Sequence, residues 1–354
     1  MPDRIVPLAI SQANSQRKQE HLDIALNNDV EFKEVHTGLD DYQFIHQALP
    51  EIDLTSINLS TPLFGKMLSA PLVISSMVGG IDAAARINRN LAQAVQEMGV
   101  AMGVGSQRCA IDEPVTASSY EVRNIAPDIL LFANLGAVQL NYGYGVSECC
   151  QAVEMIGADA LVLHLNPLQE ALQPGGNTNF AGLLSKIEKV CRELSVPVIV
   201  KEVGWGISDT VARKLASVGV SGIDVAGAGG TSWSEIEGQR VHTKGGANIT
   251  RTFASWGIPT AESIGMVLRG APEITVIASG GIRTGLEVAK AMALGADAAG
   301  MAALLLKAAS ISEESVIAAI QKVTEELKVA MFCIGAASIK ELKNTSLLRG
   351  KTRG

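Results

Sequence analysis

A unit of one strand and one helix recurs along the chain from Pro71 onward, and it limits the possible folds more than any other feature. Short aliphatic runs alternate with longer amphipathic segments. Such alternation with short joints produces parallel strands connected by right-handed crossovers. The eight strands expected from this pattern are residues 72–75, 100–104, 129–133, 160–164, 198–201, 222–225, 275–278 and 298–301.

Eight consecutive units fit a closed (β/α)8 TIM barrel better than the doubly wound open sheet, which is the alternative fold. Four of the amphipathic segments end at Gly99, Gly157, Gly219 and Gly295. Glycine caps a helix in the left-handed conformation without a Cβ penalty. Residues 157–160 and 295–298 both read Gly-Ala-Asp-Ala, which indicates two helix-to-strand joints of the same design.

The sequence divides into a barrel and two flanking segments. Residues 1–70 contain a polar, helix-like stretch at 15–26 and too few apolar residues for a core of their own. We therefore expect an N-terminal extension packed on a barrel of residues 71–345, with a C-terminal tail at 346–354. The connection 232–260 is long for a barrel joint, and we expect a partly ordered, mobile loop there.

Composition excludes several classes of protein. With 47% hydrophobic and 18% charged residues among 354, the chain can bury one large core. A net charge of −7 argues against a nucleic-acid surface. No apolar run is long enough for membrane insertion and no signal segment opens the chain, so we expect a cytoplasmic protein. The five cysteines lack metal-ligand spacing and predict neither a zinc site nor a disulfide framework.

The most polar strand end lies at residues 164–170, in a fold that gathers its chemistry at the carboxyl ends of the strands. An apolar strand ends at His164, and Pro167 cannot continue the hydrogen-bond ladder. We expect Gln169 and Glu170 on the turn just beyond it. The alternative is a hydrogen-bonded core histidine followed by an ordinary loop.

Two glycine-rich turns, 227–231 and 279–283, follow the sixth and seventh strands and predict a phosphate site, because glycine lets backbone amides approach an anion. Arg283 would add a guanidinium fork, or it is a solvated surface charge. Lys201 ends an apolar strand, and its ammonium could steady negative charge on a flavin ring. The alternative for Lys201 is an ion pair with Glu202 or Asp224.

A second basic cluster lies near the start of the chain. Arg17 and His21 fall one turn apart on the predicted helix, with Lys18 beside them. A solvated helix face is one reading. The other is a diphosphate pocket that Arg108 and His164 complete, with Glu170 as the ligand of Mg²⁺, an ion that often takes just one or two carboxylates.

These residues resemble the type 2, FMN-dependent isopentenyl-diphosphate Δ-isomerases from about residue 17 to about residue 303. The motif after the fourth strand is the distinctive one, whereas Gly-Gly-Ile-Arg occurs across FMN barrels. The matching motifs are Arg17-Lys18-x-x-His21, Ser76-Met-Val-Gly-Gly80, Gly105-Ser-Gln-Arg108, Ala133-Asn-Leu-Gly136, His164-Leu-Asn-Pro-Leu-Gln-Glu170, Val200-Lys-Glu-Val-Gly204, Gly229-Gly-Thr-Ser-Trp233 and Ser279-Gly-Gly-Ile-Arg283.

The resemblance implies interconversion of isopentenyl and dimethylallyl diphosphates, with reduced FMN, Mg²⁺ on the substrate, NAD(P)H as reductant, and assembly as a homo-tetramer or homo-octamer. Val78 departs from the family's Met-Thr-Gly-Gly turn and removes a hydroxyl near the flavin. The implied FMN contacts are Ser76, Met77, Val78, Ser106, Asn134, Lys201, Thr231, Gly280, Gly281, Arg283, Ala302 and Ala303. The implied substrate ligands are Arg17, Lys18, His21, Arg108, His164, Asn166 and Gln169, with Glu170 on the metal and with His164 and Gln169 catalytic.

The implied reaction adds and removes a proton without net redox change, and no protein residue at the barrel mouth is an obvious acid. The resemblance suggests that flavin N5 moves the proton with help from Gln169 or a water. No Rossmann fingerprint indicates a resident dinucleotide. One rival is an FMN oxidoreductase such as a 2-hydroxy-acid oxidase, which needs a late base histidine, whereas the only late one is His242. The other rival is a flavin-binding module with a vestigial diphosphate pocket.

Overall fold

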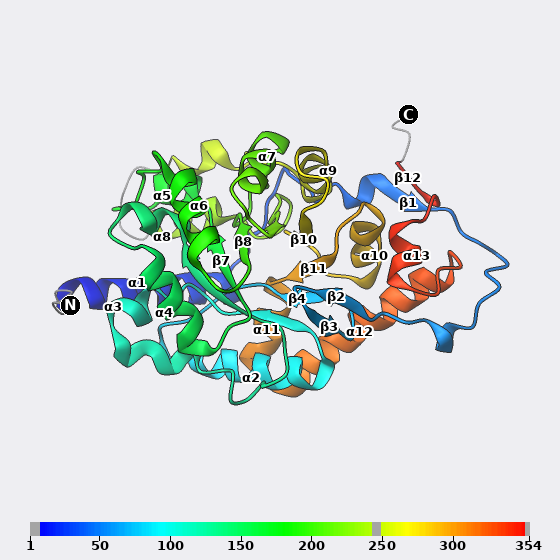
Figure 1. Ribbon diagram of the computed structural model, residues 1–354, viewed down its shortest axis with the longest axis horizontal. Helices are drawn as coiled ribbons and strands as arrows, with labels where there is room; N and C mark the ends of the chain where they lie inside the picture. The colour runs from blue at the N-terminus through cyan, green and yellow to red at the C-terminus, as the bar shows by residue number, and fades with distance from the viewer. Residues whose placement is uncertain (1–7, 243–248, 351–354) are drawn as a thin grey trace.

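The computed structural model describes residues 8–242 and 249–350, and its centre is a closed barrel of eight parallel strands (Figure 1). The strands follow one another around the barrel in chain order, and β11 pairs with β4 to close it. The predicted TIM barrel is confirmed, and the open sheet is excluded. The strands are β4 (Leu72–Ile74), β5 (Ala101–Gly103), β6 (Leu131–Gly136), β7 (Ala160–His164), β8 (Val198–Lys201), β9 (Gly222–Asp224), β10 (Thr275–Ser279) and β11 (Ala298–Met301).

Helices cover the outside of the barrel, as the pattern of amphipathic segments predicts (Figure 1). The helices that follow the barrel strands are α2 (Asp82–Met98), α3 (Arg108–Asp112), α4 (Val146–Ile156), α5 (Pro167–Leu172), α6 (Leu183–Glu193), α7 (Asp209–Ser217), α8 (Trp233–His242), α9 (Thr260–Gly270), α10 (Gly285–Ala293), α11 (Ala303–Ile311), α12 (Glu313–Phe332) and α13 (Ile339–Lys343). No helix in the described ranges combines the length and apolarity needed to span a bilayer.

Apolar side chains fill the barrel lumen. Val73, Phe132 and Ile277 belong to one buried cluster inside the barrel, while neighbouring strand residues pack outward under the helices. A hairpin of β2 (Thr61–Leu63) and β3 (Lys66–Leu68) supplies Leu63 and Leu68 to the same cluster. Its turn residue Phe64 meets Phe132 edge to face, with 6.0 Å between ring centroids. The amino end of the barrel is therefore closed, and a ligand site is left to the carboxyl end.

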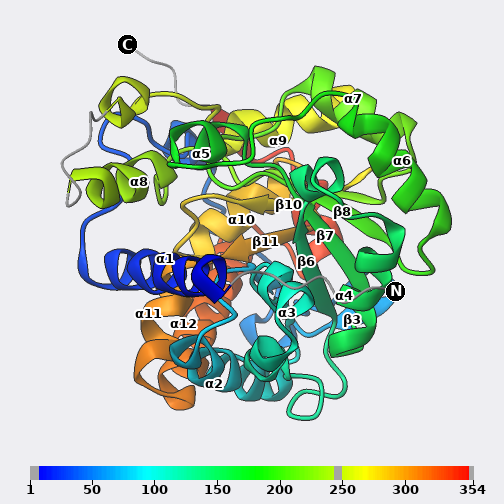
Figure 2. The same cartoon turned by 90° about the vertical axis from the view of Figure 1, so that its left-hand side faces the viewer.

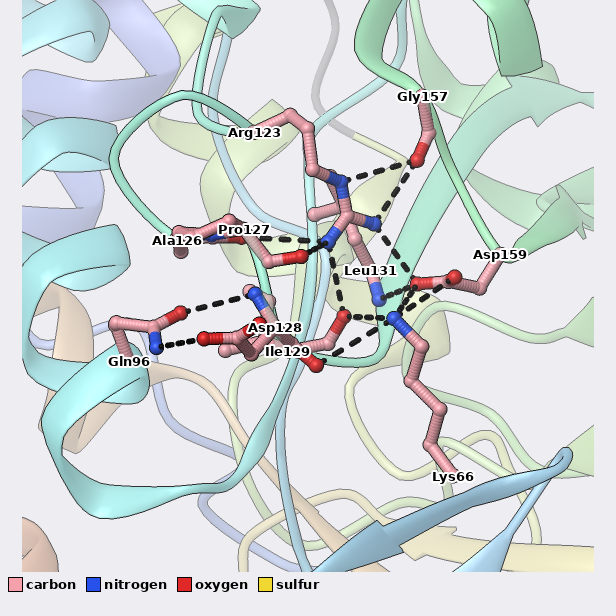
Figure 3. A network of polar contacts seen from close by, with 10 residues as sticks. All are labelled: Lys66, Gln96, Arg123, Ala126, Pro127, Asp128, Ile129, Leu131, Gly157 and Asp159. Carbon is pink, nitrogen blue, oxygen red and sulfur yellow. Dashed lines mark hydrogen bonds and ion pairs between the residues drawn. The ribbon is translucent and has the colours of Figure 1, made fainter.

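The repeated Gly-Ala-Asp-Ala joint has one structural function in both places. Gly157 and Gly295 adopt positive φ of 57° and 109°. The aspartate that follows then accepts a hydrogen bond from the preceding strand: Asp159 Oδ2 from the Leu131 amide at 2.9 Å, and Asp297 Oδ2 from the Val276 amide at 2.8 Å. Figure 3 shows that Lys66 and Arg123 converge on the same Asp159 carboxylate. Each aspartate thus fixes the start of its own strand relative to the start of the neighbouring strand.

The N-terminal extension lies against the barrel mouth. Helix α1 (Leu8–Asn27) covers the predicted helix 15–26 and contacts α8 and α11, between which it lies in Figure 2. Farther along, β1 (Tyr42–Phe44) pairs with β12 (Leu348–Gly350), so part of the predicted tail forms a strand. The proposed division into extension, barrel and tail stays a prediction.

The connection 232–260 contains a helix that the sequence analysis did not predict. Residues 233–242 form α8, and 250–253 form a short 3-10 helix. The sequence pattern that would predict this helix is weak, because α8 is polar over most of its length and contains Gly238. Its contacts with α1 and α5 stabilise it instead. Residues 243–248 of this connection lie outside the described residues, and the predicted mobility stays a prediction.

Candidate active site

One cavity of about 780 Å³ opens at the carboxyl ends of the barrel strands, a volume typical of small-molecule sites. Strand ends form its base, and α1, α5, α8 and the start of α11 contribute to its walls. Every residue that the sequence analysis assigned to cofactor, substrate, metal or catalysis lines this cavity, while the roles stay predictions. These residues are Arg17, Lys18, His21, Ser76, Met77, Val78, Ser106, Arg108, Asn134, His164, Asn166, Gln169, Glu170, Lys201, Thr231, Gly280, Gly281, Arg283, Ala302 and Ala303.

The two glycine-rich turns pack backbone against backbone at one end of the cavity. A Cβ on Gly230 would lie 2.4 Å from the Gly281 nitrogen, and one on Gly280 would lie 2.1 Å from the Gly227 oxygen. Beside them α11 begins at Ala303 without a side-chain cap, so its first amides are free to bind an anion. Adjacent glycine turns and an uncapped helix start fit a phosphate group.

Arg283 lies at this end of the cavity but is paired. Its Nη2 is 2.7 Å from Glu31 Oε1, and the two side chains are 38% and 51% exposed. Glu31 comes from the segment that follows α1, and no sequence pattern marked it. The Arg283 guanidinium, which was predicted to bind a phosphate, thus forms an ion pair with the Glu31 carboxylate at the rim of the cavity.

Three titratable side chains stand in register on neighbouring strands. His164 of β7 pairs with Lys201 of β8, which pairs with Asp224 of β9, so their side chains share the inner face of the barrel. Lys201 Nζ donates to the Glu202 backbone oxygen at 2.6 Å. Within the described ranges it forms no ion pair with the carboxylate of Glu202 or Asp224, so the alternative reading of Lys201 is not observed.

His164 is held as a neutral ring. Its Nδ1 lies 2.8 Å from Asn134 Oδ1, so Nδ1 carries the proton and Nε2 is left as an acceptor. Burial, followed by the positive charge of Lys201, lowers the pKa of His164 to about 4. The ring therefore adds no positive charge to the cavity at neutral pH, and its predicted contact with the substrate stays a prediction.

Two buried carboxyl groups stand near Lys201. Burial raises the pKa of Glu202 to about 7, although three backbone amides, those of residues 203–205, donate to its Oε2. Burial also raises the pKa of Asp224, with Lys201 and the Ser279 hydroxyl acting in the opposite direction. Neither carboxyl group lines the cavity, so both act behind the strand ends rather than on a ligand.

Gln169 and Glu170 belong to the short helix α5 rather than to a turn, which corrects the prediction. Proline with its fixed φ suits the first helical position, so Pro167 begins a helix as it ends the strand. The buried Asn166 Nδ2 donates to both Gln169 Oε1 and Glu170 Oε1, each at 3.1 Å. Asn166 Oδ1 is buried with no hydrogen-bond partner, an arrangement that a ligand donor would complete.

Glu237 of α8 is a central residue that the sequence analysis missed, because α8 was read as a loop. Its Oε1 lies 2.9 Å from His21 Nε2 and accepts a long 3.5 Å hydrogen bond from Gln169 Nε2, while Oε2 pairs with Arg240. Burial alone would raise the pKa of Glu237, but His21 and Arg240 hold it below its ordinary value. An ionised carboxylate therefore joins α1, α5 and α8.

Arg17 and Arg108 place two positive charges at the same end of the cavity, and Arg108 forms an ion pair with Asp112. Arg17 forms no hydrogen bond or ion pair within the described part of the chain, and burial and then Arg108 lower its pKa. Arg108 Nε lies 3.5 Å from Asp112 Oδ2, and this buried nitrogen has no hydrogen-bond partner. Two guanidinium groups that repel one another beside Glu170 favour a polyanionic ligand.

Potential metal ligands are few. The described residues contain no group of three or more His, Cys, Asp or Glu side chains that could hold a metal ion. All five cysteines are free, and Cys109 is the one among them that lines the cavity. A metal ion here would depend on oxygen atoms of a ligand as well as on protein.

Known proteins match this chain over most of its length. The family model for FMN-dependent dehydrogenases matches residues 11–127 and 170–349. An isopentenyl-diphosphate delta-isomerase of a Nostoc species is 51% identical over 348 residues, covering 97% of this chain and 98% of that protein. The chain belongs to the type 2, FMN-dependent isopentenyl-diphosphate isomerases. The family member from Cronobacter sakazakii is 49% identical over 336 residues, covering 95% and 97%.

A solved structure extends the likeness in fold beyond this isomerase family. A mandelate oxidase variant superimposes with a TM-score of 0.63 at 19% identity, covering 96% of this chain and 98% of that one. At that identity the match shows the shared barrel alone. The site chemistry must therefore be argued from the residues of the cavity.

Proposed function

We propose that this chain interconverts isopentenyl and dimethylallyl diphosphates, with reduced FMN as cofactor, Mg²⁺ on the substrate and NAD(P)H as the reductant. The family supports FMN and the isomerase activity. The observation that supports the rest is the Arg17 guanidinium, which has no partner among the described residues and lies near Arg108 and the carboxylate of Glu170. Such a corner suits a metal-bound diphosphate, while the glycine turns suit a separate phosphate.

The glycine turns and the start of α11 would hold the FMN phosphate through backbone amides. Lys201 would face the ring, where its ammonium favours negative charge. When bound, reduced FMN supplies the proton-donating and proton-accepting group that no side chain of the cavity provides. The other proposed contacts with the cofactor are Ser76, Met77, Val78, Ser106, Asn134, Thr231 and Arg283.

Val78 contributes its backbone carbonyl group to the turn of residues 76–80, which follows β4. The Gly105 amide donates to the Val78 carbonyl oxygen at 3.1 Å, and a Cβ on Gly105 would lie 2.5 Å from that oxygen. The turn is thus held by main-chain contacts that do not need the family's threonine hydroxyl. We expect Val78 to keep the turn in place and to lose only the side-chain hydrogen bond.

Arg17, His21 and Arg108 would bind the diphosphate oxygens, and Glu170 would bind Mg²⁺. Mg²⁺ keeps several waters and binds through few carboxylates together with substrate phosphates, which agrees with a site that offers one. Asn166 fixes Glu170 from one side, and the Asn177 amide donates to its other oxygen at 2.5 Å. The carboxylate is therefore held in one orientation before the metal arrives.

Gln169 would guide the proton at the alkene. Its Oε1 faces Asn166 and its Nε2 faces Glu237, so both ends of the amide are fixed. An isomerisation needs an acid at one carbon and a base at the allylic carbon, each within contact distance. We assign Gln169 to hold the reacting carbons or a water at that distance, and neutral His164 to accept a hydrogen bond at Nε2.

The test incubates the purified protein with FMN, Mg²⁺, isopentenyl diphosphate and NADPH at less than the substrate concentration. Dimethylallyl diphosphate formed in excess of the NADPH consumed supports the isomerase. Loss of NADPH in proportion to product supports an oxidoreductase, and no product supports a flavin-binding module. The proposal also includes a cytoplasmic homo-tetramer or homo-octamer, and light scattering after gel filtration measures the assembly.

A further inference from the structure

The buried carboxyl group of Asp224 lies beside Lys201 and has no part in the proposed binding of substrate or metal. Asp224 is 4% exposed, and it is the direct neighbour of Lys201 in the register of β8 and β9. Neighbouring strands lie about 4.8 Å apart, so the two side chains stand next to one another on the inner face of the barrel. We propose that Asp224 is the counter-charge of Lys201 and limits how strongly the base of the cavity favours negative charge on a bound flavin ring.

The hydrogen bonds of Asp224 are those of an ionised carboxylate. Its Oδ1 accepts from the Ser279 hydroxyl at 2.5 Å and from the Ala226 amide at 3.4 Å. No residue in the described ranges accepts a hydrogen bond from this group, whereas a protonated carboxyl group would need an acceptor for its proton. Burial raises the pKa of Asp224, and Lys201 followed by the Ser279 hydroxyl opposes that increase. Asp224 therefore carries negative charge next to Lys201.

Glu202, the other buried carboxyl group near Lys201, is neutralised in a different way. Its Oε2 accepts from the amides of residues 203, 204 and 205 at 2.7, 2.8 and 2.6 Å. Its charge is thus matched by the turn that follows β8. Asp224 accepts from a single amide, which is distant, and the charge nearest to it in the register is that of Lys201. Asp224 is therefore the carboxylate that balances Lys201.

The charge of Asp224 should be felt by a flavin ring that Lys201 faces. This step rests on the proposed function, which places the ring at Lys201. Reduction can leave negative charge on the N1 and C2 carbonyl region of the ring, which Lys201 stabilises and Asp224 destabilises. One charge about 10 Å away, in a medium of effective dielectric constant of about 20, changes such an equilibrium by roughly tenfold. Removal of the carboxylate should therefore favour the reduced, anionic flavin.

The midpoint potential of the FMN-loaded protein, measured without oxygen against reference dyes, tests this inference. Asp224→Asn keeps the shape of the side chain and an oxygen that accepts from Ser279, and it removes the charge. The midpoint potential should rise by about 30 mV, which corresponds to a tenfold change for a two-electron couple. Asp297→Asn is the matched control, because it removes a carboxylate that pairs with Lys343 at the amino end of the barrel. The control should leave the potential unchanged.

Two further variants separate the charge of Asp224 from its packing. Asp224→Glu keeps the charge and should have a potential close to that of the wild type. Ser279→Ala removes the hydroxyl that stabilises the Asp224 carboxylate and should raise the potential by less than Asp224→Asn does. An unchanged or lower potential in Asp224→Asn, or in Ser279→Ala where the first variant does not fold, would overturn the proposal. The measurement needs bound FMN and no turnover, so an absence of isomerase activity would be recognised separately, in the product assay.

Discussion

Gly230→Ala should weaken FMN binding while leaving the barrel folded. The new Cβ would lie 2.4 Å from the Gly281 nitrogen, whereas ordinary contact begins at 3.4 Å, so the two turns must separate by about 1 Å. Overpacking of this kind costs about 1–3 kcal/mol. If the cost falls on the phosphate site, the dissociation constant of FMN should rise by roughly 5- to 150-fold. Both turns lie at the mouth, so their separation need not disturb the lumen.

The assay removes FMN and titrates the protein with FMN or riboflavin, following flavin fluorescence. Riboflavin lacks the phosphate, so its affinity should change little. Gly145→Ala is the matched control, because its Cβ would meet nothing nearer than Glu148 Oε2 at 3.7 Å and it lies outside the cavity. An equal loss for both flavins, or unchanged FMN affinity, would refute a phosphate site between these turns.

Four further outcomes are expected. Gln169→Ala should lower turnover by about 100-fold or more and keep FMN bound, as kinetics and the flavin spectrum will show. Glu170→Gln should raise the Mg²⁺ concentration for half-maximal turnover by about tenfold or more. Asp159→Asn should lower the free energy of unfolding in urea by about 1.5 kcal/mol, since it weakens hydrogen bonds from charged groups at a partly exposed site. The unfolding free energy should also decrease as the pH is lowered from 6.5 to about 4, because His164 is protonated in the unfolded chain but not in the folded one. His164→Asn should reduce this pH dependence.

Each of these outcomes can fail in a recognisable way. Normal turnover in Gln169→Ala would remove the amide from the reaction, and an unchanged Mg²⁺ requirement in Glu170→Gln would assign the metal to another ligand. Unaltered stability of Asp159→Asn would mean that Lys66 and Arg123 find equivalent partners. An identical pH slope with and without His164 would show that other groups, such as His21, set it.

The barrel was predictable because its signals are local. Strands buried on both faces read as continuous apolar runs, and glycines at helix ends adopt the positive φ that their position implies. The carboxyl ends of parallel strands then gather the polar residues. The four polar residues between positions 164 and 170 line one cavity for this reason: His164, Asn166, Gln169 and Glu170.

Several of the misses concern partners distant in sequence. Glu237 meets His21 across 216 positions, on a helix too polar to be recognised by its periodicity. Arg283 pairs with Glu31, and nothing in either segment announces the other. Such side-chain contacts depend on which distant segments pack together, and the sequence of either segment alone does not show this.

The Phe64 hairpin determines how ligands travel. Because it closes the amino end of the barrel, cofactor and substrate should both enter through the cavity at the carboxyl end. In the proposed enzyme a seated diphosphate should slow the exchange of flavin, and loading should be ordered, with FMN first. Closure of the amino end should therefore couple the binding of FMN to the binding of the diphosphate.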